Sequence, residues 1–163
     1  MTVTAQASSA QQMTREVTLS RLLDAPRELV WAAWTDGKHM AQWWGPHHFT
    51  NPVCDIDARV GGGWLIHMKA PDGTIYPMTG TFTEVVKPER LRFKAFAEAL
   101  DGTKYLESDT TVTFEQEGSR TRLTVKASAR GLHPAAPQML GGMEAGWSQS
   151  LERLAALVGT MSR

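Results

Sequence analysis

The chain has 163 residues, of which 17 are basic and 17 are acidic, so it carries no net charge at pH 7. This length is typical of one domain with a substantial core. The balanced charge excludes the strong positive field that nucleic-acid-binding proteins need. The single cysteine, Cys54, excludes an internal disulfide and a cysteine-based metal cluster. We therefore predict one domain in a reducing compartment, and hence a cytoplasmic protein without a nucleic-acid partner.

The first fourteen residues contain neither a basic start nor an apolar run. They lack the pattern of a secretion signal or of a membrane span, so we expect no membrane contact. We predict a disordered tail over 1–14 and a single domain over 15–160. Met13 directly precedes the first patterned segment, which makes it a candidate for the true start of translation.

The domain should begin with a strand and two short helices. Residues 15–23 alternate apolar and polar side chains, which predicts a strand. Asp24 and Pro26 then predict a helix start, because aspartate accepts free N–H groups and proline suits the first turn. A second, shorter helix should follow residues 36–37 and end at Trp43-Trp44-Gly45-Pro46. Four tryptophans fall within fourteen residues here, and rings at this density must be buried in a core or at the mouth of a cavity.

The middle of the chain predicts only strands and tight turns. Alternating apolar residues and intervening glycine or proline turns predict strands over 53–60, 64–68, 74–86, 91–96, 105–117 and 121–129. Pro77 indicates a sheet edge or a bulge. Residues 61–63 are three glycines, which we interpret as a turn and bulge because a strand follows them, whereas a phosphate loop needs a helix. The count is about six or seven antiparallel strands.

The last element is helical. Its apolar residues recur at steps of three and four, namely Met139, Met143, Trp147, Leu151, Leu154 and Val158. One continuous helix over 135–158 would be about 36 Å long, enough to cross the sheet. Gly141, Gly142 and Gly146 lower its helix propensity by about 1 kcal/mol each. Such glycines indicate close approach to a neighbour or space left empty.

Short motifs along residues 15–158 carry a family resemblance. They are Trp34-Thr-Asp36, Trp43-Trp44-Gly-Pro46, Gly61-Gly62-Gly63-Trp64, Pro71-Asp-Gly-Thr74, Tyr76-Pro77, Gly80, Pro88-Glu-Arg90-Leu91 and Gly146-Trp147. In this order they resemble the START-like SRPBCC superfamily, and within it the branch named after the C-terminal domain of the activator of the heat-shock protein 90 ATPase. The resemblance implies an α+β helix-grip fold, in which a curved antiparallel sheet wraps around a long C-terminal helix.

The superfamily has several functions. Its members include lipid and hormone carriers, polyketide cyclases and aromatases, proteins that sequester an antibiotic, and a co-chaperone domain. That co-chaperone carries a further N-terminal domain for which we expect no room in this chain, so a chaperone partner is implied by the family name alone. A homodimer is compatible with the resemblance, and no sequence feature decides it.

In a helix-grip fold, the concave face of the sheet and the long helix enclose a pocket. We predict that a ligand contacts residues that the alternation and the helix period place there, namely Trp44, Trp64, His67, Met68, Tyr76, Met78, Phe82, Phe93, Met139, Met143 and Trp147. Methionine and tryptophan walls suit a small apolar or aromatic ligand, with His67 or Tyr76 as its polar anchor. A slip of one residue in strand phase would exchange His67 and Met68. The alternative is that these side chains fill the space as an ordinary core.

The sequence offers little for catalysis or metal binding. The five histidines, His39, His47, His48, His67 and His133, lack the spacing of a metal site. No histidine is placed beside Cys54, and no Gly-x-Ser-x-Gly motif occurs. A carboxylate would act as a general acid or base only if it lay in the cavity, and the candidates are Glu84, Glu98, Glu107 and Asp109. We therefore nominate no catalytic residue, metal or cofactor.

Three functions stay open at this point. The leading hypothesis is a non-catalytic pocket that binds a small hydrophobic or aromatic molecule. It predicts that Trp147→Ala, or a bulky residue in place of Gly142, changes ligand affinity more than it changes the fold. The second hypothesis is a co-chaperone-like protein-interaction domain. The third is a cyclase- or hydrolase-type enzyme that uses the same cavity and moves a proton with a histidine or a carboxylate.

Overall fold

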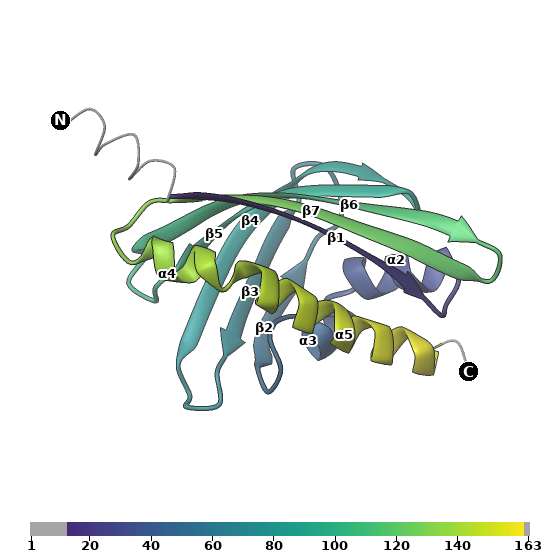
Figure 1. The fold of residues 1–163 in the computed structure, drawn as a ribbon, viewed down its shortest axis with the longest axis horizontal. Coiled ribbons are helices and arrows are strands. Elements are labelled where there is room, and N and C mark those ends of the chain that lie inside the picture. Colours follow the sequence, from purple (N-terminus) through teal and green to yellow (C-terminus); the bar gives the residue numbers. More distant parts are fainter. Residues whose placement is uncertain (1–12, 162–163) are drawn as a thin grey trace.

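The computed structural model describes residues 13–161. In this part of the chain seven strands form one curved sheet in the order β1-β7-β6-β5-β4-β3-β2, with every neighbouring pair antiparallel (Figure 1). The strands are β1 (Thr14–Leu23), β2 (Thr50–Ile56), β3 (Gly63–Lys69), β4 (Ile75–Val86), β5 (Arg90–Glu98), β6 (Lys104–Glu117) and β7 (Arg120–Gly131).

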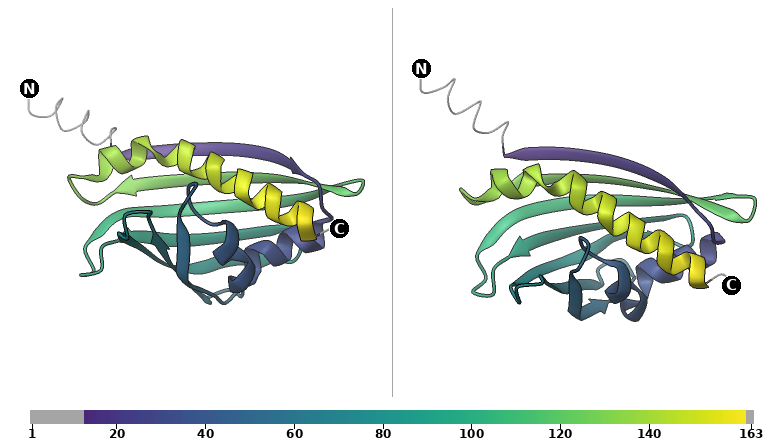
Figure 2. Two further views of the ribbon diagram at one scale, coloured as in Figure 1. Left: turned by 90° about the horizontal axis from the view of Figure 1, so that it is seen from below. Right: turned by 60° about the horizontal axis from the view of Figure 1, so that its bottom comes forward.

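The helices lie on the concave side of this sheet. They are α2 (Arg27–Thr35), α3 (Gly37–Trp43), α4 (Ala136–Gly141) and α5 (Met143–Met161). The long α5 runs across the concave face, and α2 and α3 contact it toward its C-terminal end (Figure 2). This arrangement confirms the predicted α+β helix-grip fold. No helix among residues 13–161 has the length and hydropathy that a membrane span requires.

The alternation of side chains along the strands determines what faces α5. On β6, Thr110, Val112 and Phe114 are buried on the concave side, whereas Glu107 and Asp109 lie on the outer face in ion pairs with arginines. Helices α2 and α3 contribute Trp31, Trp34, Met40 and Trp43 to the buried core. The cavity described below lies toward the other end of α5.

The C-terminal helix differs from the prediction of one continuous element over 135–158. Helix α4 ends at Gly141 and α5 begins at Met143, with Gly142 between them at φ −89° and ψ −2°. Two adjacent glycines have the lowest helix propensity of any pair without proline, so the break falls where the helix is weakest. Helix α4 contacts β7, while α5 contacts β1, α2 and α3.

Three predicted boundaries also change. Strand β2 ends at Ile56, because residues 57–62 leave the sheet in tight turns with the Arg59 N–H bonded to the Asp57 carbonyl at 2.8 Å. Helix α2 begins at Arg27 with Pro26, not Asp24, at the N-cap position. Of the predicted tail, residues 1–12 lie outside the described residues, and Thr14 already belongs to β1.

Candidate functional site

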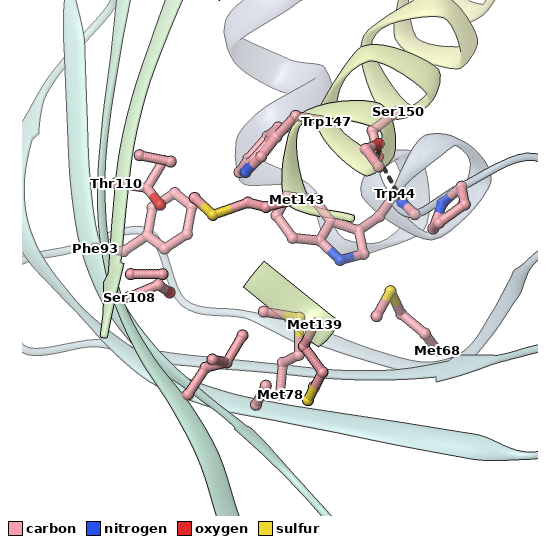
Figure 3. Close-up of a pocket in the computed structure, with 17 residues that line it drawn as sticks. Trp44, Met68, Met78, Phe93, Ser108, Thr110, Met139, Met143, Trp147 and Ser150 are labelled. Carbon is pink, nitrogen blue, oxygen red and sulfur yellow. Dashed lines mark hydrogen bonds between the residues drawn. The ribbon is translucent and has the colours of Figure 1, made fainter. Parts of the chain in front are cut away.

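A cavity of about 220 Å³ lies between the concave face of the sheet and the C-terminal helices (Figure 3). The sheet lines it with Met68, Met78, Phe93, Ala97, Leu106, Ser108, Thr110, Ala127 and Ala129, the helices with Met139, Met143, Gly146, Trp147 and Ser150, and the loop after α3 with Trp44, Gly45 and Pro46. None of these seventeen residues has an ionisable side chain. The polar side chains in the lining are two serines, one threonine and the indoles.

The cavity exists because small side chains occupy the middle of the concave face. Thr110 of β6 pairs with Phe93 on one side and Ala127 on the other, and the next row places Ser108 beside Ala129. Protein interiors are normally filled to crystal-like density. Short side chains at four of these five positions leave the space between sheet and helix open.

Helix α5 supplies the opposite wall from a single face. Met143, Trp147 and Ser150 point to the cavity because residues three and four apart share a side of a helix. Gly146 lies on the same side, and a Cβ added there would meet nothing within 4 Å. Gly142 does not line the cavity. The position where a bulky residue would block the pocket is therefore Gly146, rather than Gly142.

Arg153 of α5 holds the loop that closes one side of the cavity. Its Nη1 donates to the carbonyl oxygens of Trp44, Gly45 and Pro46 at 2.9, 3.0 and 3.0 Å, and its Nη2 donates to that of Gln42 at 3.2 Å. The last carbonyls of a helix lack partners within the helix and attract a cation. Burial lowers the pKa of the Arg153 guanidinium, but so strong a base stays charged at neutral pH.

Two further contacts shape this loop. The Ser150 hydroxyl accepts a hydrogen bond from the Gly45 N–H at 3.1 Å, and the Asn51 amide donates to the Trp44 carbonyl at 2.8 Å. Gly45 has a φ of +95°, and a Cβ there would lie 3.2 Å from the Met68 sulfur. Glycine is required for this conformation, and the loop is fixed by residues from α5 and β2.

The tryptophans divide between core and cavity. Five of the six form a chain of ring contacts, with centroid distances of 4.7 Å for Trp34–Trp43, 5.0 Å for Trp44–Trp64 and 5.2 Å for Trp44–Trp147. Trp34, Trp43 and Trp64 are at most 1% exposed and belong to the core. Trp44 and Trp147 line the cavity. The sequence left open whether these rings lie in a core or at a cavity, and both apply, to different rings.

Seven of the eleven predicted ligand-binding residues line the cavity, namely Trp44, Met68, Met78, Phe93, Met139, Met143 and Trp147. Trp64 and Phe82 do not line it. Their rings contact that of Phe93 at centroid distances of 5.0 and 6.0 Å and are 1% exposed, so they lie in the core behind the cavity wall.

The two predicted polar anchors also lie elsewhere. His67 occupies the opposite face of β3 from Met68, because successive residues of a strand alternate. Tyr76 pairs with Met68 near the start of β4, where it is 41% exposed and its ring lies 6.1 Å from that of Phe49. Neither residue contributes to the cavity lining.

The sequence-based prediction missed the small residues of the lining. It considered bulky and sulfur-containing side chains, whereas the space is created by alanines, serines, a threonine and Gly146. The alternation along β6 and β7 was the signal that would have found them, because Ser108, Thr110, Ala127 and Ala129 share the inward phase of those strands.

The carboxylates considered as general acids or bases lie outside the cavity lining. Arg92 hydrogen-bonds Asp109 at 2.7 and 2.9 Å and lowers the pKa of that carboxyl, which keeps it ionised. Glu84, Glu98 and Glu107 form comparable ion pairs with arginine or lysine.

The thiol and the imidazoles lie outside the cavity lining as well. Burial, together with the charges of Asp55 and Asp36, raises the pKa of the Cys54 thiol to about 12 and keeps it protonated. His133 Nδ1 accepts a hydrogen bond from the Ala135 N–H at 3.1 Å. Within residues 13–161, no three histidine, cysteine or acidic side chains are grouped closely enough to hold a metal ion.

Comparison with known proteins agrees with this architecture. Residues 24–159 match the family described as Activator of Hsp90 ATPase homolog 1-like protein. The AHSA1 protein from Silicibacter pomeroyi is 29% identical, with a TM-score of 0.76 over 90% of this chain and 99% of that one. A protein from Chromobacterium violaceum is 31% identical, with a TM-score of 0.75 over 88% and 96%. One from Staphylococcus epidermidis, 24% identical with a TM-score of 0.72 over 91% and 92%, shares the fold. No curated protein matches the chain.

The sheet that wraps around α5 places the protein in the START-like class of helix-grip folds. Because the family match extends over most of the sequence, the chain belongs to the Activator of Hsp90 ATPase homolog 1-like family.

Proposed function

We propose that this protein binds a small, uncharged hydrophobic or aromatic molecule in the cavity between the sheet and α5. The observation that carries the proposal is the lining itself. Four methionines and two tryptophans surround a space kept open by small residues, with no ionisable side chain among them. Flexible thioethers and aromatic faces adapt to an apolar ligand of varied shape.

The volume of the cavity restricts the ligand. An engineered cavity of about 150 Å³ holds benzene, and pockets for drug-sized ligands start at about 300 Å³. A cavity of about 220 Å³ lies between these limits. It suits one or two rings, and is too small for a sterol, a flavonoid or a long acyl chain to be fully enclosed.

Isothermal titration calorimetry with naphthalene tests this proposal, supported by native mass spectrometry of the freshly purified protein to detect a copurified molecule. We expect saturable binding with a stoichiometry of one. The Gly146→Leu variant should lose it, because its side chain occupies the cavity. Ala145→Leu is the matched control, since Ala145 is exposed on α5 and outside the lining. Absence of binding, or equal binding to both variants, would reject the cavity as a ligand site.

The description of the matching family supports a second candidate, contact with an Hsp90-type ATPase. A pull-down with the purified chaperone tests it directly. The Gly146→Leu variant separates the two candidates, because a side chain placed between the sheet and α5 should leave an outer contact surface unchanged. A pull-down without retention would remove the second candidate and leave the first untouched.

A further inference from the structure

The cavity lining contains three side-chain hydroxyl groups, and two of them are engaged. Ser108 donates to a backbone carbonyl of β5 at 3.2 Å. Ser150 accepts from the Gly45 N–H and donates to a carbonyl of its own helix at 2.9 Å. The Thr110 hydroxyl, in contrast, forms no hydrogen bond with any group among residues 13–161. It is the free hydroxyl of the cavity.

Thr110 lies within the sheet. The residue is only 2% exposed and is flanked in the sheet by Phe93 and Ala127. Figure 3 shows Thr110 and Phe93 on the sheet side of the cavity, with Met143 and Trp147 on the helix side. Buried polar groups in native proteins are nearly always hydrogen-bonded. An unpaired hydroxyl that borders an open space therefore indicates a polar atom of whatever fills that space.

The rest of the lining restricts the character of that ligand. A charged group in the cavity would be buried without a counter-ion, because none of the lining residues is ionisable. We propose that the ligand is a neutral aromatic molecule of about two fused rings, carrying one oxygen substituent that hydrogen-bonds the Thr110 hydroxyl. This inference rests on the proposed function and specifies its ligand. It makes the Thr110 hydroxyl a polar contact of the ligand, alongside the indole N–H groups of Trp44 and Trp147 that also line the cavity.

Three probes of the same ring size test it, namely naphthalene, 2-naphthol and 2-naphthoate, each titrated calorimetrically at pH 7.5. The proteins are the wild type, Thr110→Val, Thr110→Ser and the control Thr111→Val. Thr111 is the next residue of β6 and lies on the outer face, outside the cavity lining. Valine replaces the hydroxyl with a methyl group of similar size, and β-branched residues suit a strand.

In the wild type we expect 2-naphthol to bind, and 2-naphthoate not to bind. Thr110→Val should weaken the binding of 2-naphthol about tenfold, the value of one hydrogen bond, and leave the affinity for naphthalene unchanged. Thr110→Ser and Thr111→Val should retain the wild-type affinities. Without ligand, Thr110→Val should unfold at the same temperature as the wild type or a higher one, because it removes a hydroxyl that borders the cavity and forms no hydrogen bond with the described residues.

The opposite results would overturn the inference. If Thr110→Val weakens the binding of both neutral probes equally, or of neither, the Thr110 hydroxyl does not hydrogen-bond the ligand. Binding of 2-naphthoate as tight as that of 2-naphthol would refute the requirement for a neutral ligand. In both cases naphthalene binding that Gly146→Leu abolishes would leave the proposed function standing. If naphthalene does not bind the wild type, the proposed function and this inference fail together.

Discussion

The Gly146→Leu substitution should stabilise the protein while it blocks the cavity, an unusual combination for a bulky change inside a domain. A Cβ at Gly146 meets nothing within 4 Å. Replacing a helix-interior glycine gains about 0.8–1 kcal/mol in helix propensity. Burying a leucine side chain adds about 1.5–3 kcal/mol, from which about 0.5–1 kcal/mol of side-chain entropy is lost. The free energy of unfolding should therefore rise by about 1.3–3.5 kcal/mol.

Urea denaturation and thermal unfolding measure this change. For a domain of this size, about 1 kcal/mol corresponds to roughly 2–4 °C, so the unfolding temperature should rise by about 3–14 °C. The Ala145→Leu control, on the exposed side of α5, should change it little. A lower unfolding temperature for Gly146→Leu would mean that the space beside this glycine is already filled. That result would refute the claim that open space lies between Gly146 and the sheet.

Three further predictions concern the loop and the thiol. Arg153→Met removes the donor to four carbonyls and should lower the free energy of unfolding by about 2–3 kcal/mol in urea. The exposed Arg59→Met should lower it by less than about 0.5 kcal/mol, and equal losses would refute the role of Arg153 as a clamp. Gly45→Ala forces an L-residue to φ +95° and should lose about 1–3 kcal/mol in the same assay, whereas an unchanged midpoint would mean that the loop relaxes freely. Because the pKa of the Cys54 thiol rises from 9.0 to about 12 on folding, the folded state holds a proton that the unfolded state releases. The free energy of unfolding should thus fall between pH 9 and 12, and less steeply in Cys54→Ala; identical pH profiles would contradict the shift.

Periodicity predicted the elements of this fold well and their junctions less well. Alternation located the strands around Met68, Met78 and Phe93 with the correct inward phase. The end of β2 was missed, because Ala58 and Val60 continue the alternating pattern. In the structure these residues lie in hydrogen-bonded turns and not in the strand. The break at Gly142 was missed because the apolar period of α5 continues through it.

The candidate site was predicted where large side chains mark it and missed where small ones create it. Met143 and Trp147 are conspicuous on a helical face, and the structure places both on the cavity. Ala127 and Ala129 are unremarkable in a sequence, yet their size decides that the space above them stays open. His67 drew attention as a polar group, but strand phase puts it on the opposite face.

The sequence by itself therefore determined the class of the fold, because hydrophobic period and turn chemistry are local properties that each segment carries alone. Whether the tryptophan-rich segment lines a core or a cavity was decided only by the tertiary structure. That outcome depends on which small residues of β6 and β7 lie opposite Gly146. It also depends on Arg153, more than a hundred residues away in the chain, fixing the loop that carries Trp44. The volume of a cavity depends on how closely side chains from distant segments pack against one another, so no single segment encodes it.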